Sequence, residues 1–403
     1  MTDKHARDAV ILSGARTPQG KFLGALSGLT AAQLGHVAFR AALERSGVNP
    51  ADVAEVFLGN VVSAGTGQAL PRQVSLGAGL PEHVGGVAIN KVCGSGLKAV
   101  MLAASAICAE DGDLYMAGGT ESMSRAPYLN DAIRQGNKYG KVELRDALQN
   151  DGLWCHIVDW GMGNAAEFIA REMEITRREM DDFAARSHQL AARATSEGRF
   201  KREIAPIIVR DKKTERVIDT DESIRPDTTI EGLAALRPAF EADGMVTAGN
   251  APGMNDGAAA LVVASRAYAE KHGHTPLARI VGYGQAAIDP KWIFYAPVKA
   301  VPVALARAGW KMDDVDLFEI NEAFASQVLA DMRGLARDGY KMPLEKVNVN
   351  GGAIALGHPI GASGARVLVT LVHALREHGL KRGLATLCLG GGEAVAMAVE
   401  IEN

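Results

Sequence analysis

The sequence predicts an α/β fold made of two similar halves with a covering insertion between them. Short apolar runs typical of strands alternate with longer segments typical of helices, as in buried parallel sheets flanked by helices. The 45 glycines gather at the junctions between such runs, where the backbone must turn tightly or approach a ligand. Segments of the first third of the chain reappear, diverged, in the last third.

The expected elements follow one another along the chain. A strand-like run opens the sequence at residues 9–15, and five more strands are expected at Val53–Leu58, Leu114–Ala117, Ala260–Ala264, Leu317–Ile320 and Leu384–Leu387. Five segments have the length and composition of helices: Ala31–Ser46, Gly96–Ala109, Arg177–Glu197, Val298–Ala308 and Ala365–Glu377.

The internal repeat is clearest where a helix leads into a strand. Residues 42–47 read Ala-Leu-Glu-Arg-Ser-Gly and residues 304–309 read Ala-Leu-Ala-Arg-Ala-Gly, and an Asp-Val pair and a strand follow each of them. Later in each half, a strand runs into a glycine cluster. We therefore expect two α/β halves packed against each other, with a site between them that draws residues from both.

Domain boundaries follow from this repeat. Residues 1–121, continued by 245–270, form the expected N-terminal half, residues 122–244 a covering loop domain, and residues 271–403 the C-terminal half. The charges of the insertion either form a solvated surface or hold a nucleotide and its phosphates. The cations concerned are Lys201, Arg202, Arg210, Lys212, Lys213, Arg216 and Arg225.

Composition excludes several classes of protein. With 47% apolar and 22% charged residues the chain is typical of globular proteins, and its net charge of −4 gives no basic footprint for nucleic acid. No apolar run reaches the 18 residues of a membrane span, and the polar lead does not resemble a signal peptide. The four cysteines form no C-x-x-C pair, so we expect reduced thiols, no metal site and a cytoplasmic location.

Two segments carry the first candidate chemistry. Cys93 lies within Asn90–Ala99, between a strand end and a helix start, where the partial positive charge of a helix N-terminus favours a thiolate. His358 lies in the glycine-dense loop Asn350–Arg366, and its imidazole could accept the Cys93 proton.

Two further segments end strands of the second half. Cys388 ends one strand and is followed by Leu389 and a run of three glycines that begins at Gly390. Asn321 ends another and opens an Asn-Glu-Ala-Phe stretch, where its amide could donate to an oxygen or position a water.

Together these four segments resemble the thiolase family over nearly the whole chain. The order Cys93-Gly, Asn321-Glu-Ala-Phe, Gly-His358-Pro and Cys388-x-Gly-Gly-Gly is highly specific. Three other stretches match as well: Ala15–Phe22, Gly119–Ser124 and Asn250–Ala258. The resemblance implies a thiolase-like fold, with duplicated βαβ halves and mixed five-stranded sheets in layers.

The resemblance also implies a reversible, CoA-dependent Claisen condensation or thiolysis of 3-ketoacyl-CoA through an acyl-cysteine. Cys93 would be the nucleophile, His358 its base, and Cys388 the acid and base at the α-carbon. His358 and a water held by Asn321 would stabilise the enolate oxygen, and the N–H groups of Cys93 and Gly390 the tetrahedral oxygen.

Substrates and assembly follow from the same resemblance. CoA is expected as substrate and product with no permanently bound cofactor, in fatty acid metabolism such as β-oxidation. A homodimer or homotetramer is expected, because Ala126–Asp151 resembles the tetramerisation loop of the family. The residues expected at CoA or the acyl group are Met162, Arg225, Phe240, Ala248, Pro252, Phe324, Phe294 and Tyr295.

Two departures from the family pattern concern the acyl group. Family members that act on short acyl chains carry a histidine where this chain has Gly161, and glycines are common where it has Phe294 and Tyr295. Either the rings line a pocket for a branched, aromatic or longer acyl group, or they fill the vacated space and leave room for acetyl units only. We expect the first outcome.

Two alternatives remain open. A condensing enzyme of the ketoacyl-synthase type shares the fold and the cysteine nucleophile but lacks the second catalytic cysteine, so Cys388 favours the thiolase interpretation. A non-catalytic acyl-CoA-binding scaffold is motivated by the altered Phe294 and Tyr295 segment, and the intact Cys93, His358 and Asn321 oppose it.

Overall fold

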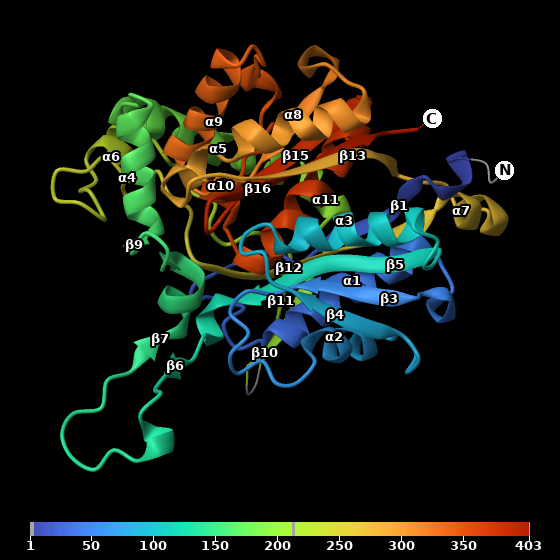
Figure 1. Cartoon of the computed structure of the whole chain (residues 1–403), viewed down its shortest axis with the longest axis horizontal. Helices are drawn as coiled ribbons and strands as arrows, with labels where there is room; N and C mark the ends of the chain where they lie inside the picture. The colour runs from blue at the N-terminus through green and yellow to red at the C-terminus, as the bar shows by residue number, and fades with distance from the viewer. Residues whose placement is uncertain (1–3, 212–213, 403) are drawn as a thin grey trace.

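Two similar halves stack their sheets and helices in layers in the computed structural model, which describes residues 4–211 and 214–402 (Figure 1). Helices α3 (Ser95–Cys108) and α11 (Ile360–His378) form the central layer, with a sheet on either side. Helices α1 (Ala31–Ser46) and α2 (Leu70–Ala78) cover one outer face, and α8 (Pro297–Ala308) lies on the other, beside α9 (Ala325–Arg337). The expected fold class is confirmed.

The sheet of the N-terminal half has five main strands. In spatial order they are β4 (Gly85–Ile89), β3 (Glu55–Gly59), β5 (Leu114–Ser122), β12 (Asn255–Ser265) and β1 (Ala9–Arg16). β4, β3 and β5 are parallel, whereas β12 is antiparallel to both of its neighbours. The short β2 (Gly20–Lys21) pairs with the start of β12.

The sheet of the C-terminal half repeats this order with one strand fewer. β14 (Leu317–Ile320) is parallel to β15 (Arg382–Leu389), and β16 (Glu393–Glu400) is antiparallel to both β15 and β13 (Ala278–Ala287). The fifth strand of this half is reduced to a single bridge between Phe318 and Val347. Only two residue pairs between β1 and β13 join the two sheets.

All five expected helices and all six expected strands are present, with longer bounds in several cases. α11 begins at Ile360, directly after its N-cap residue Pro359, rather than at Ala365, and the glycines Gly361 and Gly364 do not interrupt it. Elements missed in the sequence include α2, α9, β13 and β16. Two short helices, α7 (Arg266–His272) and α10 (Ala353–Leu356), complete the halves.

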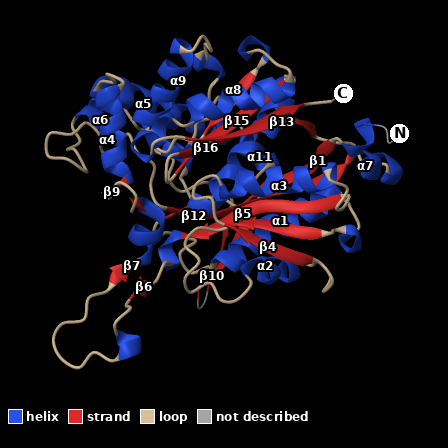
Figure 2. Ribbon diagram, in the orientation of Figure 1, coloured by secondary structure: helices blue, strands red, loops and turns tan. Residues whose placement is uncertain are grey.

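The covering segment lies along one side of both halves. Its helices are α4 (Met162–Glu172), α5 (Arg177–Ser196) and α6 (Ile230–Ala234). Its hairpins pair β6 (Tyr128–Leu129) with β7 (Arg145–Asp146), β8 (Trp154–Cys155) with β9 (Trp160–Gly161), and β10 (Ile207–Asp211) with β11 (Thr214–Ile218). The arm between β6 and β7 projects from the body as a loop with one short helical turn (Figure 2). The domain boundaries given above stay a prediction.

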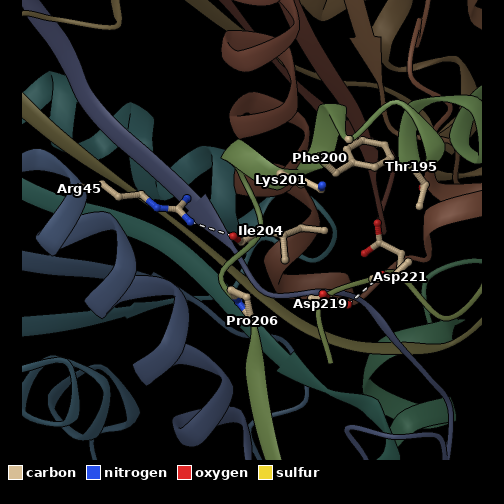
Figure 3. A pocket seen from close by; sticks show the side chains of 10 residues that line it. Arg45, Thr195, Phe200, Lys201, Ile204, Pro206, Asp219 and Asp221 are labelled. Atoms are coloured by element: carbon tan, nitrogen blue, oxygen red, sulfur yellow. Dashed lines mark hydrogen bonds between the residues drawn. The ribbon is translucent and has the colours of Figure 1, made fainter. Parts of the chain in front are cut away.

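Two arginines of the N-terminal half hold the covering segment. Arg16 is fully buried and forms ion pairs with Glu203 at 2.6 Å and Asp221 at 2.7 Å. Arg45 reaches across to the covering segment and donates to the Ile204 carbonyl at 2.8 Å (Figure 3). Because these partners are far apart in the sequence, the contacts fix the covering segment to the N-terminal half through tertiary structure rather than through local secondary-structure preference.

Two glycines allow the central helices to touch through their backbones. A Cβ placed on Gly96 of α3 would lie 2.7 Å from the nitrogen of Ala365, and one on Gly364 of α11 would lie 2.3 Å from the nitrogen of Leu97. The N-terminal turns of α3 and α11, which follow Cys93 and His358, are therefore held within backbone contact of each other.

Within the described ranges, no helix combines the length and apolarity that a membrane crossing requires.

The contact between α3 and α11 predicts that Gly364→Ala destabilises the protein and lowers its activity. The added methyl group meets backbone atoms that cannot rotate away, and overpacking of this kind costs about 1–3 kcal/mol or more. Urea unfolding measures the effect. Gly28→Ala is the matched control, since nothing lies within 4 Å of its Cβ position. Equal midpoints for the two variants would contradict the prediction.

Candidate active site

Cys93 lies in a strained turn between β4 and α3. Val92 has a φ of +45°, a left-handed conformation that a β-branched residue rarely adopts. The Ser95 hydroxyl stabilises this turn, because it accepts from the Lys91 N–H at 2.8 Å and donates to the Val92 carbonyl at 2.6 Å. The turn thus fixes the thiol at the N-terminus of a buried helix.

His358 is held by one backbone and one side-chain hydrogen bond, and the side-chain bond determines its tautomer. Its backbone N–H donates to Asn255 Oδ1 at 2.9 Å. Its Nδ1 lies 2.6 Å from the Ser363 hydroxyl, and that hydroxyl donates its only proton to the Pro359 carbonyl at 2.9 Å. Nδ1 must therefore carry the proton donated to Ser363, which leaves Nε2 as the free acceptor. The imidazole can act as a base at Nε2.

Asn321 and Cys388 complete the group from the C-terminal half. The Asn321 N–H donates to the Thr386 carbonyl at 3.0 Å, so the turn after β14 is tied to β15, the strand that carries Cys388. Both side chains are buried. Among the described residues, Asn321 Oδ1 has no hydrogen-bond partner, although its amide nitrogen lies 3.5 Å from Nδ1 of His358.

Burial dominates the electrostatics of the site. Burial raises the pKa of Cys93 to about 12, and the opposing N–H groups of Cys93 itself and of Gly390 only partly offset it. The expectation that the helix terminus makes this thiol acidic is therefore wrong for the protein without substrate. Burial, aided by the Arg366 cation, lowers the pKa of His358 to about 3, and burial raises the pKa of Cys388 well above its usual value. At neutral pH all three groups are uncharged.

Two buried carboxylates hold the loops around these residues. Glu121 accepts hydrogen bonds from the N–H groups of Val61, Val62 and Gly361, which joins the N-terminal half to the first turn of α11, just after His358. Glu322 accepts from Ser187, Asn348 and the Ile354 N–H, which joins the covering segment to the loop before His358. Glu322 lies in the Asn-Glu-Ala-Phe motif, but neither supporting role was recognised in the sequence.

A largely apolar cavity of about 480 Å³ opens onto the site. Cys93, His358, Cys388 and Gly390 line it, and Asn321 lies behind them next to His358. Six of the eight residues expected at CoA or the acyl group also line it: Met162, Phe240, Ala248, Pro252, Phe294 and Phe324. Lining residues that the sequence did not single out include Met123, Gln149, Leu153, Trp154, Asn164 and Ile293.

Arg225 and Tyr295 do not line this cavity. Arg225 is exposed, and its guanidinium lies 2.9 Å from the His188 ring. Tyr295 packs against Gly334 of α9, with Lys299 over its ring. Their proposed roles at CoA or the acyl group stay predictions.

The environment of Gly161 differs from the one expected. Trp154, on the paired strand β8, presents ring carbons 3.6 Å from the Cβ position of Gly161, and the Trp154 Nε1 donates to Asp159 at 3.1 Å. Phe294 stacks in a tilted geometry on Phe324, with ring centroids 5.4 Å apart. Trp154, rather than Phe294 or Tyr295, is therefore the ring beside Gly161.

The insertion cations that the structure describes do not line the cavity. Arg210 pairs with Glu215 at 2.7 Å, and Lys201 and Arg216 are exposed. Lys212 and Lys213 lie outside the described residues. Among the described residues, no group of three or more His, Cys, Asp or Glu side chains could hold a metal ion.

Such a duplicated α/β fold, with two cysteines, a histidine and an asparagine at one apolar cavity, defines a class of acyl-transferring enzymes. Residues 9–267 match the thiolase N-terminal domain and residues 274–401 the thiolase C-terminal domain. The chain belongs to the thiolase family and is an acyltransferase.

Relatives share this similarity over nearly their full length. The chain is 50% identical to an acetyl-CoA acetyltransferase of Cupriavidus necator and 49% identical to one of Pseudomonas aeruginosa, over 98% of this chain and 99% of each relative. Among solved structures, acetyl-CoA acetyltransferases of Bacillus anthracis (42% identity, TM-score 0.95) and Syntrophomonas wolfei (40%, 0.96) align over 98% of this chain and 99% of theirs.

The hydrogen bonds of His358 predict that Ser363→Ala lowers kcat/KM by about 10-fold or more. Without the hydroxyl, Nδ1 loses the acceptor that fixes the tautomer, which removes part of the roughly 10²–10⁴-fold contribution of a general base. Steady-state thiolysis measures it. Ser326→Ala is the control, because it removes another buried hydroxyl, one that donates to the Ala166 carbonyl at 3.0 Å instead of contacting the His358 ring. A loss of equal size in both variants would point to general destabilisation.

Proposed function

We propose that the protein catalyses the reversible thiolysis and Claisen condensation of 3-ketoacyl-CoA through an acyl group on Cys93. The observation that carries this proposal is the tautomer of His358, which leaves Nε2 able to accept a proton. His358 lines the same cavity as Cys93 and Cys388. One base and two thiols in an apolar cavity suit two successive proton transfers.

In thiolysis, the first transfers involve Cys93. Nε2 of His358 accepts the Cys93 proton as the sulfur attacks the 3-keto carbon, and the N–H groups of Cys93 and Gly390 stabilise the oxyanion that forms. Both N–H groups lower the pKa of the Cys93 thiol, which supports their placement at this sulfur. A neutral thiol beside a neutral base suits this step, because charge develops only as the bond forms.

The second half of the reaction involves Cys388. When the bond between the α- and β-carbons breaks, the leaving enolate of acetyl-CoA takes a proton from Cys388 and departs as acetyl-CoA. His358 and a water on Asn321 would stabilise the enolate oxygen, and the unpartnered Oδ1 of Asn321 supports such a water. The protonated His358 then returns its proton to the Cys388 thiolate. Its Nε2 next takes the proton of the incoming CoA thiol, whose sulfur attacks the acyl group, and gives that proton to the departing Cys93 sulfur. The reverse sequence gives condensation.

Assembly and location are further parts of the proposal. The arm between β6 and β7 exposes Tyr128, Ile133, Tyr139 and Leu144, and Tyr139 is 99% exposed. An apolar surface of this kind on a projecting arm supports contact with another copy. We propose a homodimer or homotetramer in the cytoplasm.

The division of labour between the thiols predicts different defects in two variants. Cys388→Ala should still release about one equivalent of CoA from acetyl-CoA, because Cys93 is intact, but thiolysis of acetoacetyl-CoA should fall by about 10²–10⁴-fold. Cys93→Ala should release none. Stopped-flow release of CoA and steady-state assays measure both.

The outcome also separates the alternatives. A Cys388→Ala variant that condenses at the wild-type rate would favour a ketoacyl-synthase-type enzyme. Wild-type protein that neither releases CoA nor thiolyses any 3-ketoacyl-CoA would favour a binding scaffold.

The apolar cavity wall predicts a preference for an acyl group larger than acetyl. Leu153, Trp154, Ile293 and Phe294 line it, and a methylene in an apolar pocket is worth roughly 1–3 kcal/mol, or 10-fold or more in kcat/KM. The test compares kcat/KM for acetoacetyl-CoA with that for longer and branched 3-ketoacyl-CoAs. A clear preference for acetoacetyl-CoA would contradict the predicted preference for larger acyl groups but not the proposed reaction type.

A further inference from the structure

An ion pair links the two loops that carry the N–H groups at Cys93. Lys91 lies two residues before Cys93, and Glu393 begins β16 directly after the three glycines that start at Gly390. The Lys91 ammonium donates to the Glu393 carboxylate across 302 residues of sequence. One partner therefore comes from each half of the fold.

The backbone between these loops is closely packed. Val92, which has a left-handed backbone conformation, places its side chain 3.0 Å from the position of a Cβ on Gly390. A Cβ on Gly94 would lie 2.5 Å from the Leu389 side chain. Cys93 lies in the loop after β4, whereas Gly390 lies in the loop after β15. The distance between the Gly390 N–H and the Cys93 sulfur therefore depends on how these two loops pack against each other.

We propose that Lys91 and Glu393 are positioning residues, which hold the two loops in register so that the N–H groups of Cys93 and Gly390 converge on the reacting atoms. This inference rests on the proposed function, in which those groups stabilise the oxyanion. The pair is partly exposed, with 23% and 37% of the two side chains accessible, so its contribution to overall stability is small. Its contribution to geometry is larger, because donors at an oxyanion act only over short distances.

A direct effect of either charge on the thiol is a separate possibility with a different signature. Charged or titratable groups near the pair and the thiol are Lys98 on α3, Glu121, His358 and Cys388. If charge acted directly, loss of the Lys91 cation would make Cys93 less reactive and loss of the Glu393 anion would make it more reactive. If the pair acts by position, both losses move the Gly390 N–H away and make Cys93 less reactive.

The experiment compares Lys91→Met, Glu393→Gln and the charge swap Lys91→Glu/Glu393→Lys in the full chain. The rate of Cys93 alkylation by iodoacetamide, followed by peptide mass spectrometry between pH 7.5 and 9.5, reports the thiol without any need for turnover. We expect both single variants to be alkylated about 5–10-fold more slowly. We also expect their kcat for thiolysis to fall about 10-fold with little change in KM, less than the roughly 10²–10³-fold loss of an entire oxyanion donor. The charge swap should restore most of both.

Lys299→Met is the matched control, because it breaks an exposed ion pair with Asp338, the residue that follows α9, and should change neither rate. Alkylation rates that move in opposite directions in the two single variants, or that do not move, would overturn the proposal, as would a charge swap no better than the single variants. If wild-type protein shows no thiolysis, the proposed function fails, whereas the alkylation rates still test the positioning role.

Discussion

The contact between α3 and α11 is the constraint on which the site depends. Gly96 and Gly364 let the two helices touch through their backbones, and the catalytic loops precede those same helices. The sheets join through only two residue pairs, so the central helices, rather than strand pairing, determine how the halves sit. Cys93 comes from one half, and His358 and Cys388 from the other, so a shift at this contact would separate nucleophile from base.

Burial in the cavity determines how the proton transfers must occur. An isolated helix terminus would favour a thiolate, but the loss of water around Cys93 outweighs it and keeps the thiol neutral. His358 is neutral for the same reason, and its tautomer depends on one hydroxyl, that of Ser363. Cys93 and His358 therefore hold no separated charges before the substrate binds, and the N–H donors of the site stabilise charge mainly once an oxyanion forms.

Local patterns in the sequence predict much of this arrangement. Glycine clusters and apolar runs indicate the strands and helices, and the motifs single out Cys93, His358, Asn321 and Cys388. Other features depend on contacts between distant segments. Trp154 lies beside Gly161 only because β8 pairs with β9, and the fifth strand of the second half shrinks to a bridge at Val347, a difference that no local pattern indicates.

The central claim is that the two thiols have separate roles, with Cys93 carrying the acyl group. The most direct measurement is incubation of wild-type protein with acetyl-CoA, an acid quench, and protease digestion with mass spectrometry of the cysteine peptides. The account predicts one acetyl group, on the peptide that contains Cys93. An acetyl group on the peptide that contains Cys388 would contradict it and reverse the assigned roles.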